Sequence, residues 1–100
     1  METFSSSFPS SFQILGHTYK IKLVKRVDEE GNRGEVDFEN KVIRIQKPTK
    51  GYSYDMALET LYHEISHIML DEMEYSELSK DETLIERLGR SLHQVIRSMK

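Results

Sequence analysis

The sequence predicts a small α+β domain in which a three-stranded antiparallel sheet packs on two helices. Its 100 residues suffice for one domain with a modest core. Strand-forming residues alternate with charged residues in the first half, whereas the apolar residues of the second half recur at helical spacing. We therefore expect strands at about residues 12–27, 35–38 and 41–46, and helices at about residues 54–73 and 80–99.

The composition is that of a soluble globular protein, with 37% hydrophobic and 31% charged residues. A net charge of −3 argues against binding to nucleic acid or to an anionic membrane surface. The chain has no cysteine, which excludes disulfides, thiol catalysis and any Cys-ligated metal. No apolar run approaches the ~18 residues of a membrane-spanning helix. We therefore expect a cytoplasmic protein, and the sequence leaves its oligomeric state open, with a homodimer as one option.

Residues 1–11 precede the first predicted strand and are rich in serine and phenylalanine. They have neither a basic start nor a continuous apolar stretch, so they lack the features of a secretory signal. We expect residues 1–11 to form a flexible tail and residues 12–100 to form a single domain. Phe4, Phe8 and Phe12 leave another option open, in which the tail docks on the domain, on a partner subunit or in a cleft.

Turn signals separate the predicted strands. Gly16 and His17 interrupt the first strand and divide it into a short segment and a longer one. Residues 28–34 contain two glycines and an asparagine, which predict a turn. Glu39 and Asn40 predict a tight turn between the second and third strands. The three strands are therefore expected to form an antiparallel meander with one buried face.

The first predicted helix has Ser53 as its N-cap and an acidic residue, Asp55, in its first turn. Its apolar residues share one broad face, which we expect to pack on the sheet: Leu58, Leu61, Ile65, Ile68 and Met69. His63 and His67 lie almost opposite that face. A further element must therefore cover the two histidines.

The second helix is expected to supply that cover. Residues 79–82 read Ser-Lys-Asp-Glu and provide side chains that cap a helix start. A continuous apolar stripe follows, formed by Leu84, Ile85, Leu88, Leu92, Val95, Ile96 and Met99. Gly89 has no side chain and would let the two helices approach closely.

Residues 63–67 read His-Glu-Ile-Ser-His, which is the H-E-x-x-H pattern of zinc metallopeptidases. His63 and His67 are four residues apart and share one side of a helix, so both imidazoles can bind one metal ion. Glu64 lies at the flank of that side, where its carboxylate can take a proton from a metal-activated water. Two ordinary polar histidines are the structural alternative, but the adjoining glutamate favours a metal site.

A hydrolytic zinc site takes three protein ligands, so one more is required. The candidates are the remaining histidines and two glutamates of the second helix: His17, His93, Glu82 and Glu86. Helical projection places Glu82 at the edge of the apolar stripe and Glu86 further toward solvent, which favours Glu82. Glu86 would then accept a hydrogen bond from a ligating histidine, or would replace Glu82 as the ligand. His93 is expected to be a surface residue.

Ser79 and Glu82 also fit a different pattern. A serine followed three residues later by a glutamate is a capping box, in which the glutamate bonds back to the amide of the N-cap residue. In this alternative Glu82 stabilises the helix start and does not reach a metal.

With these residues, the chain resembles very small gluzincin-type zinc metallopeptidases, the minigluzincins, and the ImmA/IrrE-like metallopeptidase domains of phages and mobile elements. The resemblance covers about residues 36–96 and depends on segments 61–70 and 81–89. It implies a small zincin-like domain with a strand at the cleft edge that can pair with an extended peptide. It also implies that Glu82 is the third ligand and Glu86 its neighbour, and that such minimal proteins can be latent zymogens with a terminal segment in the cleft.

The expected function is therefore peptide hydrolysis by a zinc metallopeptidase that acts on a peptide or protein substrate and holds one Zn²⁺ per chain. His63, His67 and Glu82 are the expected ligands, and Glu64 is the expected general base. Residues 1–11 are the candidate for a segment that blocks the cleft. The alternative is a catalytically silent, zinc-stabilised interaction module of a phage or mobile element.

Overall fold

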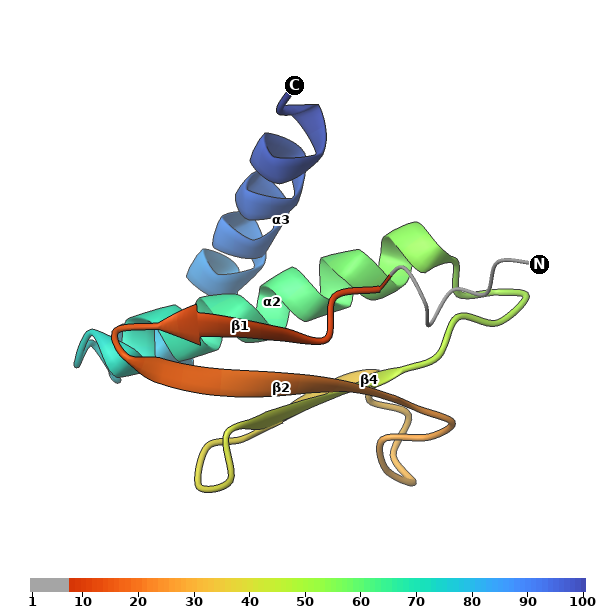
Figure 1. The fold of residues 1–100 in the computed structure, drawn as a ribbon, viewed down its shortest axis with the longest axis horizontal. Helices are drawn as coiled ribbons and strands as arrows, with labels where there is room; N and C mark the ends of the chain where they lie inside the picture. The colour runs from red at the N-terminus through yellow and green to blue at the C-terminus, as the bar shows by residue number, and fades with distance from the viewer. Residues whose placement is uncertain (1–7) are drawn as a thin grey trace.

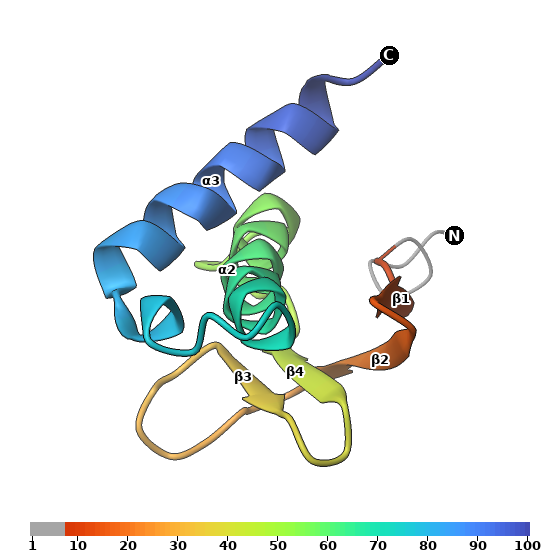
Figure 2. The same ribbon diagram turned by 90° about the vertical axis from the view of Figure 1, so that its left-hand side faces the viewer.

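The computed structural model describes residues 8–100 and has the α+β fold that the sequence predicts (Figure 1). Four strands form one sheet: β1 (Ser11–Ile14), β2 (His17–Val24), β3 (Gly34–Asp37) and β4 (Val42–Gln46). Two helices follow, α2 (Tyr54–Glu72) and α3 (Glu82–Ser98), with the short 3-10 helix η1 (Leu78–Lys80) between them. Helix α2 lies between the sheet and α3 (Figure 2). Within this described part of the chain, neither α2 nor α3 has the length and apolarity needed to cross a membrane.

The sheet corrects the predicted three-stranded antiparallel meander. Its strand order is β1-β2-β4-β3, and it is mixed because β2 and β4 run parallel, with Ile21 opposite Ile43. The side chains account for this order. Ile43 and Ile45 of β4 are fully buried, as suits an inner strand, whereas β3 carries Glu35 and Asp37 and lies at the edge. The chain therefore passes from β2 to the outer position before β4 returns beside β2.

The first predicted strand, residues 12–27, is in fact two strands. Leu15 and Gly16 have positive φ angles of 47° and 85° and form the two-residue turn of a hairpin in which Ile14 pairs with His17. The predicted interruption is confirmed, but the pairing of its two halves adds a fourth strand. The hairpin predicted between the second and third stretches is also confirmed, since β3 and β4 pair in antiparallel fashion.

The described part of the predicted tail belongs to the domain. Phe8 is buried, and its ring meets that of Tyr54 edge-on with 5.7 Å between centroids. Phe12 stacks on Tyr19 with 5.5 Å between centroids. Of the predicted tail over residues 1–11, Phe8 thus packs in the core and Ser11 begins β1, and residues 1–7 lie outside the described residues.

The core lies between the sheet and α2. Its buried side chains come from β2, β4, α2 and the segments before β1 and α2: Phe8, Tyr19, Ile21, Ile43, Ile45, Tyr52, Ala57, Leu61 and Ile68. Ser53 caps α2 as predicted, because its hydroxyl accepts a hydrogen bond from the backbone N–H of Met56 at 3.1 Å. The cap and the buried face together fix which side of α2 is turned away from the sheet.

Helix α3 packs on α2 through a face that includes only part of the predicted apolar stripe. Its buried residues are Ile85, Gly89 and His93, which recur every four residues. Val95 and Ile96, in contrast, are exposed. The missing side chain of Gly89 makes this face the one of closest approach, and the C-terminal half of α3 projects away from the sheet (Figure 1). Much of the stripe is therefore left uncovered by this domain.

Candidate metal centre

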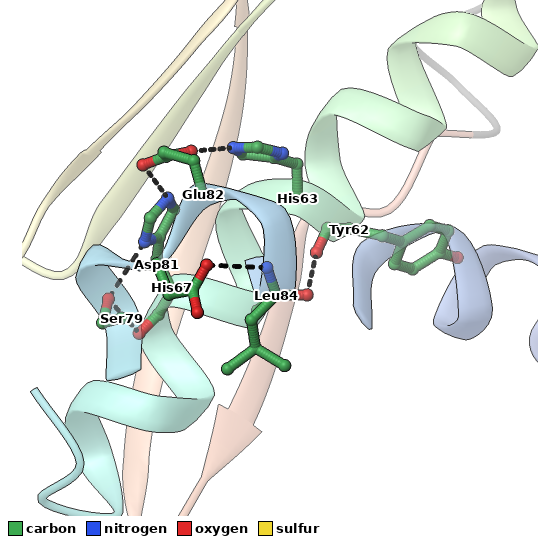
Figure 3. Close-up of polar contacts among 8 residues, drawn as sticks. Tyr62, His63, His67, Ser79, Asp81, Glu82 and Leu84 are labelled. Atoms are coloured by element: carbon green, nitrogen blue, oxygen red, sulfur yellow. Dashed lines mark hydrogen bonds and ion pairs between the residues drawn. The ribbon is translucent and has the colours of Figure 1, made fainter. Parts of the chain in front are cut away.

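Helix α2 presents His63 and His67 on the side that faces the start of α3 (Figure 3). The two rings are one helical turn apart, with 5.2 Å between their centroids. Glu82 in the first turn of α3 extends its carboxylate over both rings. Its two oxygens lie 3.5 Å from Nε2 of His63 and 3.6 Å from Nε2 of His67. The structure thus brings together the three residues that the sequence suggested as ligands.

The start of α3 leaves the Glu82 carboxylate free for this contact. The N-cap of α3 is Asp81, whose side chain accepts a hydrogen bond from the backbone N–H of Leu84 at 3.2 Å. Ser79 lies in η1, before the cap. The alternative capping box between Ser79 and Glu82 is therefore not formed.

The spacing of the three ligand atoms suits a tetrahedral metal site. Ligands that surround zinc at ~2.0–2.1 Å in a tetrahedron lie about 3.4 Å from one another. The two contacts of Glu82, each through a different carboxylate oxygen, are close to this length at 3.5 and 3.6 Å, and exceed the ~2.7–2.9 Å of a charge-assisted hydrogen bond. All three atoms lie within 4.8 Å of one another. The donor set of two imidazole nitrogens and one carboxylate oxygen also suits zinc.

The contacts of His67 with Ser79 fit the tautomer that a metal ligand requires. Its Nδ1 lies 2.9 Å from Oγ of Ser79, and the same hydroxyl can donate to the backbone oxygen of His67 at 3.5 Å. A hydroxyl that donates to the carbonyl accepts from Nδ1–H, which leaves the lone pair on Nε2. That nitrogen faces Glu82 and the space between the ligands.

His63 is kept neutral by its surroundings. Burial and the neighbouring His67 lower the pKa of His63, while Glu82 and Glu86 act in the opposite direction. A metal binds the neutral form of imidazole, so the net shift favours ligation.

Gly89 sets the distance between the two helices at His63. A Cβ at this position would lie 3.0 Å from Cα and 3.1 Å from the backbone nitrogen of His63. The close approach that the sequence predicted from Gly89 is therefore present. It brings the first turn of α3, with Glu82, within reach of both histidines.

A cavity of about 410 Å³ adjoins His63. Helix α2 lines it on one side, the residues that lead into β3 on another, and α3 on a third. The lining residues are Glu59, Thr60, His63 and Glu64 from α2, Asn32, Arg33 and Gly34 from β3 and the preceding loop, and Glu86, Gly89 and Arg90 from α3.

Glu64 lines this cavity directly beside His63. Burial raises the pKa of Glu64 to about 7, and repulsion from Glu82 and Glu35 adds to the effect. A carboxyl group with a pKa near 7 can both accept and return a proton at neutral pH. Its position and its pKa therefore suit a general base.

Gly34 makes room for Glu64. It begins β3, and a Cβ there would lie 2.7 Å from Cγ2 of Thr60 and 3.2 Å from Oε2 of Glu64. A residue with a side chain would push both groups away from the strand. Sequence reasoning missed this role because Gly34 had been assigned to a turn.

The two other histidines are not part of the cluster. Nδ1 of His17 lies 2.9 Å from Oε2 of Glu72. His93 is buried, which contradicts the expected surface position, and its Nε2 lies 3.1 Å from Oδ1 of Asp55. The expectation of a surface position for His93 is wrong because the packing face of α3 extends beyond the predicted stripe and includes this residue.

Glu86 lies near the cluster but not within it. It forms an ion pair with Arg90 at 3.0 Å and lines the cavity beside His63. The predicted hydrogen bond from a ligating histidine to Glu86 is replaced at His67 by the bond to Ser79. Sequence reasoning assigned Ser79 to the helix cap, and the capping-box pattern concealed this second use.

Comparisons with protein-family models, with curated proteins and with solved structures find no match to this chain. The case for a function therefore depends on the geometry of His63, Glu64, His67 and Glu82.

Proposed function

We propose that the chain is a zinc-dependent metallopeptidase that hydrolyses peptide bonds. The observation that carries this proposal is the convergence of the ligand atoms of His63, His67 and Glu82 beside Glu64, at a cavity open to solvent. Three ligands leave the fourth position of a tetrahedral ion for water or substrate, as catalytic zinc sites require. The same residues match the gluzincin pattern in the sequence.

His63, His67 and Glu82 would hold the ion, and one Zn²⁺ per chain is expected. A bound zinc ion acts as a Lewis acid that lowers the pKa of water and polarises a carbonyl group. Glu64 would accept the proton of the attacking water and return it to the leaving amine. Gly34 leaves room for the Glu64 side chain beside β3.

The edge strand beside the cavity supports a peptide as the substrate. β3 is the outermost strand of the sheet on this side, and the residues that lead into it line the cavity. An extended peptide can add to such an edge through main-chain hydrogen bonds. The scissile bond would then lie over α2, close to His63 and Glu64.

The central test is the substitution Glu64→Gln in zinc-loaded protein. We expect cleavage of a peptide library to fall by ~10²–10⁴-fold, because the amide cannot accept the proton. Zinc content should stay at the wild-type level. The control is Glu39→Gln, since Glu39 is an exposed residue of the β3–β4 turn. Undiminished cleavage by the Glu64→Gln variant would show that Glu64 is not the base.

The metal is tested separately with His67→Ala. This change removes one of the three ligands, so zinc measured by elemental analysis should fall well below one ion per chain. Cleavage should be measured for the full chain and for a chain that lacks residues 1–7, because latency would appear as activity gained by truncation. The truncation ends before Phe8, which belongs to the core.

The second candidate function is a zinc-stabilised interaction module without catalysis. The apolar residues that α3 leaves exposed favour it, since exposed apolar patches mark interaction surfaces. They are Val95, Ile96 and Met99. Stoichiometric zinc without cleavage, in both the full and the truncated chain, would support this function over the peptidase.

A further inference from the structure

Arg33, in the loop that leads into β3, lines the cavity together with residues of α2 and α3. Glu64, the proposed general base, lines the same cavity, and Gly34, the residue after Arg33, lies against it. No step of the proposed hydrolysis uses Arg33. Its position therefore raises the question of which substrate group it contacts.

The Arg33 side chain is held in place by a rigid support. Its backbone oxygen accepts a hydrogen bond from the N–H of Gln46 at 2.9 Å, and its guanidinium carbon lies 4.3 Å from the ring centroid of Tyr52. Tyr52 is almost completely buried and donates a hydrogen bond to Oγ1 of Thr60 at 2.8 Å. A guanidinium stacked on a fixed ring loses little further freedom when it binds a ligand.

The charges around the cavity leave Arg33 available to an anion. Within residues 8–100, no carboxylate lies within ion-pair distance of Arg33, whereas Arg90 on the other side is paired with Glu86 at 3.0 Å. Glu59 also lines the cavity, at the end shared with a neighbouring cavity. Among the described residues, Arg33 is thus a cation of the cavity that has no carboxylate partner. Its planar fork of donors matches the two oxygens of a carboxylate.

We propose that Arg33 determines specificity by binding a carboxylate of the peptide substrate close to the cleaved bond. This inference rests on the proposed function, because it names the substrate class of the same site. The carboxylate belongs either to an Asp or Glu side chain or to the C-terminus of the peptide, and both present the same pair of oxygens. A charge-assisted bidentate pair corresponds to about a 10- to 100-fold preference over the neutral amide.

The test compares matched peptides. A peptide that the zinc-loaded wild-type chain cleaves is first located and its cut site found by mass spectrometry. Versions with Glu or Gln at each position beside the cut are then compared, each with a free or an amidated C-terminus. We expect the carboxylate to raise kcat/KM by about 10- to 100-fold, chiefly through KM. The position or the terminus at which the effect occurs identifies the source of the carboxylate.

The variant Arg33→Gln should lose the preference and cleave the Glu and Gln peptides at similar rates. Arg33→Lys keeps the charge and the alkyl stem but not the fork, so it should retain only part of the preference. Arg87→Gln is the matched control, since Arg87 is an exposed arginine of α3 that does not line the cavity. It should keep the wild-type preference.

Equal cleavage of acidic and neutral peptides by the wild-type chain would overturn the inference. So would a preference that survives Arg33→Gln. Should no peptide be cleaved by any form, the proposed function fails, and Arg33 is then tested independently by binding of a peptide library, in matched acidic and amide versions, to zinc-loaded Glu64→Gln protein. Tighter binding of the carboxylate peptides that Arg33→Gln abolishes would then support the inference, and equal binding would overturn it.

Discussion

Ser79 illustrates how a residue outside the ligand set can prepare a metal site. Its single hydroxyl lies 2.9 Å from Nδ1 of His67 and 3.5 Å from the backbone oxygen of the same residue. These contacts fix both the tautomer and the orientation of the ring. The lone pair of Nε2 is then directed toward Glu82 before any ion binds, which lowers the cost of ordering the ligand.

We predict that Ser79→Ala weakens zinc binding by ~10–100-fold without removing a ligand, because the His67 ring loses its partner. Competition with a chromophoric chelator measures this affinity. The control is Ser91→Ala on α3, where the hydroxyl bonds to the backbone oxygen of Arg87 at 2.8 Å and has no contact with the site. Equal zinc affinity of the wild-type and Ser79→Ala proteins would contradict this role.

Sequence spacing was sufficient to select His63, Glu64 and His67, because a helix converts a four-residue interval into neighbouring side chains. Glu82 was chosen among alternatives, since its partners lie on another helix. The contact of Ser79 with His67 joins residues 12 apart across the turn between the helices. No periodicity encodes such a contact, so it could be found only in three dimensions.

At the scale of elements, the helices and the β3–β4 hairpin could be predicted, but the arrangement of the sheet could not. The alternation of apolar residues predicts a strand and its buried face. The same alternation occurs whether the neighbouring strand is parallel or antiparallel. The parallel pairing of β2 with β4 therefore had no local signal. Gly89 did predict the close approach of α3 to α2, but an apolar stripe contains no polar residue and so did not predict that His93 is buried there.

We predict that Gly89→Ala destabilises the protein, although alanine is the better helix former. The added Cβ would meet backbone atoms of His63 at 3.0 and 3.1 Å, so the helices must separate. Overpacking of this kind costs ~1–3 kcal/mol and outweighs the ~1 kcal/mol gain in helix propensity. Urea unfolding measures the change, and zinc affinity should fall as Glu82 moves away from the histidines.

Gln94→Ala, at an exposed position of α3, is the control for Gly89→Ala and should change the unfolding free energy by less than ~0.5 kcal/mol. A Gly89→Ala protein as stable as the wild type would show that α2 and α3 can separate at no cost. Glu82 would then not depend on Gly89 for its position.

At the scale of the whole molecule, the carboxylate of Glu72 links strand β2 of the sheet to the C-terminal end of α2. Nδ1 of His17 and the hydroxyl of Tyr19 both lie 2.9 Å from Oε2 of Glu72, the last residue of α2. Burial, with a further contribution from Glu72, raises the pKa of Tyr19 to about 12, so this hydroxyl stays protonated and donates. The hydrogen bonds from His17 and then Tyr19 lower the pKa of Glu72. Helix α2 carries His63 and His67, so this contact also anchors the element that bears two residues of the candidate site.

The lowered pKa of Glu72 predicts how the stability of the metal-free protein depends on pH. The folded state binds the proton of Glu72 less readily than the unfolded state, so the contribution is complete above the unfolded pKa of ~4.3. It is lost as the pH falls through the lower pKa of the folded state.

Glu72→Gln should therefore reduce the unfolding free energy by about 1–2 kcal/mol at pH 7, and this deficit should shrink toward zero as the pH falls to 3. Urea unfolding in the presence of a chelator measures both proteins, and Glu74→Gln, at an exposed residue just beyond α2, should follow the wild type. If the loss of unfolding free energy in Glu72→Gln were the same at every pH, the negative charge of Glu72 would not be the source of its contribution to stability.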